Sequence, residues 1–172
     1  MPKKVWIIDT NVLSLWLDIP KKNSPQNING ITWNKTYVRN LICKAENITF
    51  VLPLATLIET GNHIAGINGQ KRYYLAQELA NILTKAIDEE SPWAAFTEQY
   101  NLWETDNLKK LAEEWPSLAV QGLSMGDITI KWVAEYYSGI GYHVETLTLD
   151  KGLKSYEPIA KTKKIPRRRR NY

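Results

Sequence analysis

The sequence predicts an α/β protein with a central, mostly parallel sheet, helical layers on both sides of it, and a helical middle segment. The first observation is that short apolar runs, typical of strands buried on both faces, alternate with segments of helical periodicity. The second is the length, because 172 residues suit a single domain. We expect this domain to span residues 1–160, with a basic, disordered tail over residues 161–172.

The N-terminal part begins with a predicted strand and helix. Val5 to Ile8 is an apolar run that ends at an acid, and Asn11 to Leu17 supplies the helix. Ile19 to Gly30 contains two prolines and a cluster of Asn, Lys and Ser, which favours an exposed loop. Helical spacing then resumes, with the apolar positions Trp33, Tyr37, Leu41 and Ile42.

A second strand and helix follow. Ile48 to Leu52 contains β-branched and aromatic residues and is bounded by Pro53, which predicts a strand. Leu54 to Ile64 has helical periodicity. Glu59 lies on this helix but off its apolar stripe, so it is not simply a core residue.

The remainder is helical up to one last strand. Leu75 to Ala86 predicts a long amphipathic helix, and Leu108 to Trp115 a shorter one that stops at Pro116. Asp127 to Tyr137 is apolar on all sides after its first residue, which indicates a buried helix that opens with an acid. Tyr142 to Leu149 then predicts the last strand.

Four acids occupy related places in this scheme. Asp9 and Asp150 directly follow predicted strands, Glu59 lies about two turns into a helix that follows another, and Asp127 begins the buried helix. Ligands of open parallel sheets bind in the crevice beyond the carboxyl ends of the strands. We therefore expect the four carboxylates to converge there.

Carboxylates gathered in this way would repel one another unless a cation neutralised them. Mg²⁺ or Mn²⁺ suits a site made of oxygen ligands, whereas Cys43, His63 and His143 offer little material for zinc. Such an ion activates water and stabilises charge on a phosphate group. The acids therefore point to hydrolysis of phosphodiester bonds.

Each acid also has a purely structural interpretation. Asp9 could cap the first helix, and Asp127 could be a favourable charge in the first turn of its helix. Glu59 could be a solvated surface residue, and Asp150 could begin a turn. Only the joint placement of the four acids favours a site.

These motifs resemble those of the PIN-domain ribonucleases, a family that includes the VapC-type toxins of bacterial toxin–antitoxin pairs. Ile7 to Leu13 looks like the opening strand of the family with its first metal-binding aspartate, Asp9. Glu59 resembles the acid on the helix after the second strand. Met125 to Asp127 and Thr148 to Asp150 are similar to the third acid and to the closing Thr-x-Asp motif.

The resemblance implies a PIN-like fold and a Mg²⁺- or Mn²⁺-dependent endoribonuclease, with Asp9, Glu59, Asp127 and Asp150 as catalytic and metal-holding residues. It further implies that Asn11 and Thr148 are polar helpers. A homodimer and an antitoxin protein partner are expected on the same basis. The chain departs from a minimal member in its extra length between residues 18 and 33, in its helical middle, and in its four terminal arginines.

The charge of the chain is uneven. The net charge is +4, yet seven cations lie beyond residue 160, so residues 1–160 carry −3. The tail could be only a solvated end, or it could hold RNA phosphates through cations that offset the acidic body. In the second case the binding residues are Lys163, Lys164, Arg167, Arg168, Arg169 and Arg170.

Other classes of protein are less well supported. Gly122 to Gly126 matches the Gly-x-Ser-x-Gly motif of serine hydrolases, but that fold places its histidine last and none follows His143. A non-catalytic binding module and a metal-dependent phosphatase remain alternatives. No run approaches the roughly 18 apolar residues of a membrane span, and a single cysteine makes the cytoplasm the expected location.

Overall fold

The computed structural model describes residues 3–159. Its elements run along the chain as β1 (Lys4–Ile8), α1 (Thr10–Leu17), β2 (Gln26–Ile28), β3 (Ile31–Trp33), α2 (Lys35–Cys43), β4 (Ile48–Val51), α3 (Leu54–Ala65), α4 (Lys71–Ile87), the 3₁₀ helix η1 (Phe96–Trp103), α5 (Thr105–Val120), α6 (Met125–Gly139), β5 (His143–Leu147) and α7 (Lys151–Ser155). Strands and helices alternate in the order that an α/β protein requires.

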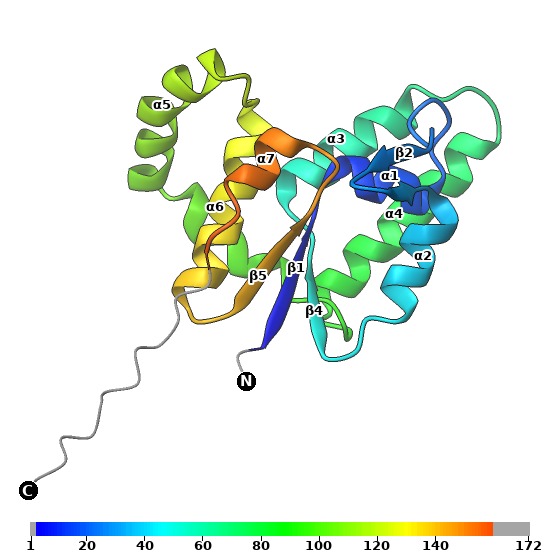
Figure 1. Cartoon of the computed structure of the whole chain (residues 1–172), viewed down its shortest axis with the longest axis horizontal. Helices are drawn as coiled ribbons and strands as arrows, with labels where there is room; N and C mark the ends of the chain where they lie inside the picture. Colours follow the sequence, from blue (N-terminus) through cyan, green and yellow to red (C-terminus); the bar gives the residue numbers. More distant parts are fainter. Residues whose placement is uncertain (1–2, 160–172) are drawn as a thin grey trace, which may run out of the picture.

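The central sheet has three parallel strands in the order β4-β1-β5. Figure 1 shows them side by side, with α5 and α6 on one side of the strands and α2 and α4 on the other. Because the strands are parallel, their carboxyl ends meet at one edge of the sheet. Asp9 follows the central strand at this edge, and its backbone N–H donates to the carbonyl of Leu147 at 3.1 Å.

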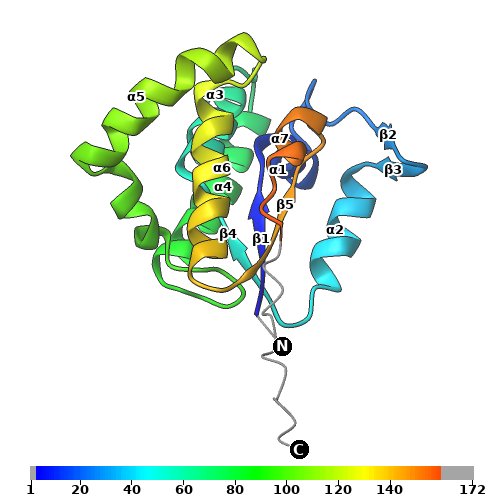
Figure 2. The same cartoon turned by 60° about the vertical axis from the view of Figure 1, so that its left-hand side comes forward.

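Helices pack on both faces of this sheet. Alternate side chains of β1 point to opposite faces: Trp6 and Ile8 join one apolar cluster, and Val5 and Ile7 join another. The first cluster includes residues of α1, α2, α3 and α4, and the second includes residues of α6. Figure 2 shows α6 and α2 on opposite sides of the strands. The fold is therefore α/β and compatible with three layers.

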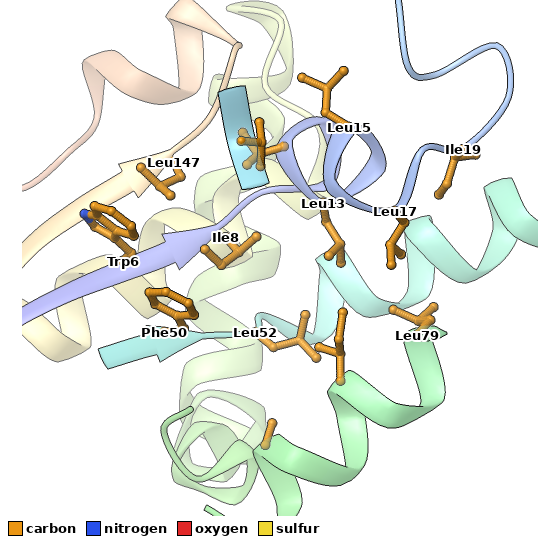
Figure 3. Packing of buried hydrophobic residues seen from close by; sticks show 14 of the residues in the cluster. Trp6, Ile8, Leu13, Leu15, Leu17, Ile19, Phe50, Leu52, Leu79 and Leu147 are labelled. Carbon is orange, nitrogen blue, oxygen red and sulfur yellow. The ribbon is translucent and has the colours of Figure 1, made fainter. Parts of the chain in front are cut away.

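The larger cluster supports the strand end that carries Asp9. In Figure 3, Ile8 lies among side chains from the strands and from α1 and α4, and its exposed fraction is 0%. Trp6 stacks on Phe50 with ring centroids 5.7 Å apart. Burying side chains of this size stabilises a fold by about 1.5–3 kcal/mol each. The backbone just before Asp9 is therefore held firmly in place.

The predicted loop from Ile19 to Gly30 is wrong in its second half. β2 and β3 form an antiparallel hairpin whose turn is Asn29-Gly30, with φ of 53° and 79°. An Asn-Gly pair favours this turn because both residues tolerate a left-handed backbone. Trp33 consequently ends a strand, and the helix starts at Lys35.

Pro116 does not stop its helix, because α5 continues through it to Val120. A proline inside a helix leaves one carbonyl, here that of Ala112, without its usual donor. Both Ala112 and Pro116 are exposed, so water can take the place of the missing donor. The prediction failed because the cost of an interior proline is smaller on a solvent-facing side of a helix.

Two further boundaries differ from the prediction. The buried helix begins at Met125 rather than Asp127, because Ser124 is its N-cap and Asp127 lies in its first turn. The last strand ends at Leu147, so Asp150 lies three residues beyond it and caps α7 instead. Among residues 3–159, no helix is long and apolar enough to cross a membrane.

Candidate active site

Asp9 is a buried carboxylate at the end of the central strand. Its exposed fraction is 5%, and it is the N-cap residue of α1. One carboxylate oxygen accepts from the backbone N–H of Thr10 at 2.7 Å, and the other accepts from the Thr148 hydroxyl at 2.6 Å. The expected helix-capping role is thus real, and it fixes the direction of the carboxylate.

The pKa of Asp9 is raised from 3.8 to about 6. Burial is the main cause, because it removes the water that would stabilise the charged form. The hydrogen bonds from Thr148 and Thr10 lower the pKa, and the nearby carboxylates of Asp127 and Glu59 raise it further. Asp9 therefore lies within electrostatic reach of two of the other predicted site residues.

Thr148 and Asn11 link the ends of β1 and β5. The Thr148 hydroxyl donates to Asp9 and accepts from the backbone N–H of Asp150 at 2.9 Å. The Asn11 side-chain oxygen accepts from the backbone N–H of Leu149 at 3.0 Å, and its amide lies 3.5 Å from the Thr148 hydroxyl. Thr148 therefore connects the Asp9 carboxylate to the backbone of Asp150, and Asn11 holds the backbone of Leu149 between them.

Glu59 is the predicted site residue on α3, and it is exposed. Its side chain on α3 is 56% exposed and accepts from the Thr10 hydroxyl at 2.9 Å. It also lies 3.9 Å from the imidazole of His63, one turn later on the helix. The bond to Thr10 draws the Glu59 carboxylate toward the start of α1 and hence toward Asp9.

Asp127 and Asp150 both serve as helix caps. Asp127 accepts from the backbone N–H and the hydroxyl of Ser124, at 2.8 and 2.7 Å, in a capping box. Asp150 accepts from the backbone N–H groups of Gly152 and Leu153, at 2.6 and 3.1 Å. Asp127 lies in the first turn of α6, as its structural interpretation expects, whereas Asp150 caps α7 rather than beginning a turn. In each acid, the capping bonds occupy one of the two carboxylate oxygens.

All four acids nevertheless line one pocket of about 400 Å³. They come from segments far apart in the chain and meet because three parallel elements end at the same edge. The remaining lining residues are Thr10, Asn11, Ser14, Lys21, Lys22, Ser24, Gln26, His63 and Ser124. The predicted convergence on one crevice is observed.

Several of these lining residues were absent from the predicted site. His63 could have been found from its spacing, because residues four apart on a helix are neighbours and it follows Glu59 at that distance. The pKa of His63 is lowered by burial and by Lys22, while Glu59 acts in the opposite direction. Lys21 and Lys22 could not have been found, because they lie in a loop without periodicity.

The side chains suit a hard divalent cation in type but are not assembled around one. The pocket offers carboxylate and hydroxyl oxygens, which are the ligands that such a cation prefers. Within the described part of the chain, however, no group of three or more His, Cys, Asp or Glu is arranged to hold a metal ion. Asp127 and Asp150 each use one carboxylate oxygen for their capping bonds, so they would have to bind an ion through the other oxygen or share the first.

The serine-hydrolase motif has a structural explanation. Ser124 is the N-cap of α6 and its hydroxyl donates to Asp127, so it acts as the expected polar residue before the helix.

Comparison with family models, with curated proteins and with solved structures found no match to this chain. The cationic residues predicted in the tail, 161–172, lie outside the described residues.

Replacing Thr148 with Val should lower the metal affinity and the activity of the site without abolishing them. The change removes the donor to Asp9 and the acceptor for Asp150, and loss of a supporting bond of this kind costs about 10–100-fold in metal affinity or activity. Titration with Mn²⁺ would measure the metal affinity, and an RNA cleavage assay would measure the activity. Thr146→Val is the matched control, because Thr146 is buried in β5 two residues before Thr148 and its hydroxyl bonds none of the four acids. Equal effects in the two variants would contradict the supporting role.

Proposed function

We propose that this protein is a divalent-metal-dependent endoribonuclease with a PIN-like fold. The observation that carries the proposal is the meeting of Asp9, Glu59, Asp127 and Asp150 on one pocket, with the pKa of Asp9 raised in part by two of the others. The order of the acids along the chain and their positions after β1, on α3, in α6 and after β5 also support it.

In this proposal the four acids hold Mg²⁺ or Mn²⁺ and Thr148 and Asn11 hold the acids. A divalent cation would supply positive charge to the phosphate and lower the pKa of the attacking water. Asp9 is positioned by a rigid strand and by two hydrogen bonds. The buried setting strengthens its electrostatic interactions, since the effective dielectric constant there is lower than that of water.

The direct test is cleavage of labelled single-stranded RNA by the full chain. Mg²⁺ or Mn²⁺ should support internal cleavage, and EDTA should abolish it. A small phosphomonoester offered under the same conditions should stay intact, which separates a nuclease from a phosphatase. Cleavage that persists in EDTA, or hydrolysis of the phosphomonoester alone, would contradict the proposal.

A second candidate is a non-catalytic nucleic-acid or protein-binding module. It is favoured by the capping bonds of Asp127 and Asp150, which give both acids a structural use. RNA binding without cleavage in any metal would support this candidate. The homodimer, the antitoxin partner and a cytoplasmic location remain predictions from the sequence.

Deletion of residues 161–172 should weaken RNA binding and flatten its dependence on salt. This segment contains seven cations, and each phosphate contact with single-stranded nucleic acid contributes about 0.7 to the slope of log affinity against log salt. Binding curves at several salt concentrations, for the full and the shortened chain, measure the change. An unchanged affinity and slope would remove the tail from the binding site.

A further inference from the structure

We propose that Lys21 and Lys22 form a phosphate-binding clamp in the same pocket as the four acids, where they hold the backbone of single-stranded RNA beside the position of cleavage. This inference rests on the proposed nuclease function. It adds a substrate-binding role for the segment between α1 and β2, which lies within the extra length noted in the sequence.

The two lysines stand at the tip of a closed loop. Asp18 ends α1, and its carboxylate accepts from the Asn23 amide at 2.6 Å and from the Lys35 ammonium at 2.9 Å. These bonds lower the pKa of Asp18, so it stays charged. Ile19, at 0% exposure, anchors the loop in the core. The bond from Asn23 to Asp18 therefore fixes both ends of the segment that carries the lysines.

Neither lysine is neutralised by a protein partner. Within residues 3–159, Lys21 and Lys22 form no ion pair within 4.0 Å, although four carboxylates line the same pocket. Other loop and helix lysines, such as Lys35 and Lys71, are paired with Asp18. Lys22 lines the same pocket as Glu59 and His63, so its charge lies beside the acids.

Cations beside a carboxylate site suit an anionic polymer. The acids would repel the RNA backbone, and two lysine charges in the same pocket offset that repulsion where the chain enters. Lysine binds phosphate as a point charge and carries no sequence information. The clamp should therefore contribute to substrate affinity and position rather than to choice of sequence.

The test compares two variants with the same change in charge. Lys21→Ala/Lys22→Ala removes the clamp, and Lys109→Ala/Lys110→Ala removes an adjacent exposed pair on α5 that does not line the pocket. The clamp variant should raise the KM for single-stranded RNA about tenfold with little change in kcat, and reduce the salt slope of binding by about 1.4, or about 0.7 for each lost contact. The control should do neither.

Binding of the same RNA in EDTA separates this inference from the nuclease proposal. If the protein binds RNA in EDTA but does not cleave it in Mg²⁺ or Mn²⁺, and only the clamp variant binds less well, the clamp stands and the nuclease proposal fails. If cleavage occurs but the two lysine variants behave alike, the clamp is wrong and the nuclease proposal stands. The clamp would also be wrong if its removal left the KM for RNA unchanged but lowered the metal concentration needed for cleavage. The lysines would then only neutralise the acids.

Asp18→Asn is a test in which the clamp and the net charge of the protein predict opposite changes in the KM for RNA. This change makes the protein more positive, so a purely electrostatic effect would lower the KM for RNA. It also weakens the bonds to Asn23 and Lys35 that close the loop, and the clamp predicts a higher KM. Circular dichroism melting of each variant confirms folding. A KM at or below the wild-type value would show that the loop does not position the lysines.

Discussion

Asp9→Asn is expected to lower metal-dependent RNA cleavage by at least about 100-fold, since it removes a proposed ligand while leaving the fold in place. The buried carboxylate of Asp9 lies within electrostatic reach of Asp127 and Glu59, and an amide carries no charge for the metal. Rates of cleavage under single-turnover conditions, in saturating Mn²⁺, measure the effect. They report the chemical step rather than release of product.

Asp88→Asn is the matched control for this experiment. Asp88 follows α4, is exposed and lies outside the pocket, so its neutralisation makes the same change in net charge. Cleavage by the control should equal that of the wild type. Full activity in Asp9→Asn would mean that the pocket is not the catalytic site, whatever the protein does with RNA.

Asp9→Asn should also make the metal-free protein more stable than the wild type near neutral pH. Folding raises the pKa of Asp9 from 3.8 to about 6, so the folded state binds the proton more tightly than the unfolded state. The wild type therefore gains stability as pH falls through about 6 and loses it as pH rises. As pH falls from well above 6 to well below 3.8, the free energy of unfolding of the wild type rises by about 3 kcal/mol in all. About 1.4 kcal/mol of this gain is already present near pH 5.

Thermal melts near pH 5 and pH 7.5, in EDTA, test this expectation. The advantage of Asp9→Asn over the wild type should be larger at the higher pH by about 3–6 °C. The new amide also changes the hydrogen bond with Thr148, but this cost is common to both pH values and cancels in the comparison. Mg²⁺ should stabilise only the wild type. A pH-independent difference would contradict the raised pKa.

Most of the secondary structure could be predicted because it depends on local periodicity. The apolar run from Val5 to Ile8 and the helical spacing of α4 survive in the fold, since both patterns place apolar side chains where the sheet and helices bury them. The failures are also local in origin. The hairpin at Asn29-Gly30 had a recognisable turn signal in the sequence. Whether the helix continues through Pro116 depended instead on which side of α5 faces water.

The sequence alone predicted that the four acids would gather in one crevice, because parallel strands must finish at one edge, and all four line one pocket. Only the tertiary structure decided what Asp9 and Glu59 contact, whereas the capping bonds of Asp127 and Asp150 are local. It buried Asp9 against Thr148, directed Glu59 to the hydroxyl of Thr10, and brought Lys21 and Lys22 into the same pocket. These outcomes depend on packing between distant segments, and no local pattern of residues encodes that packing.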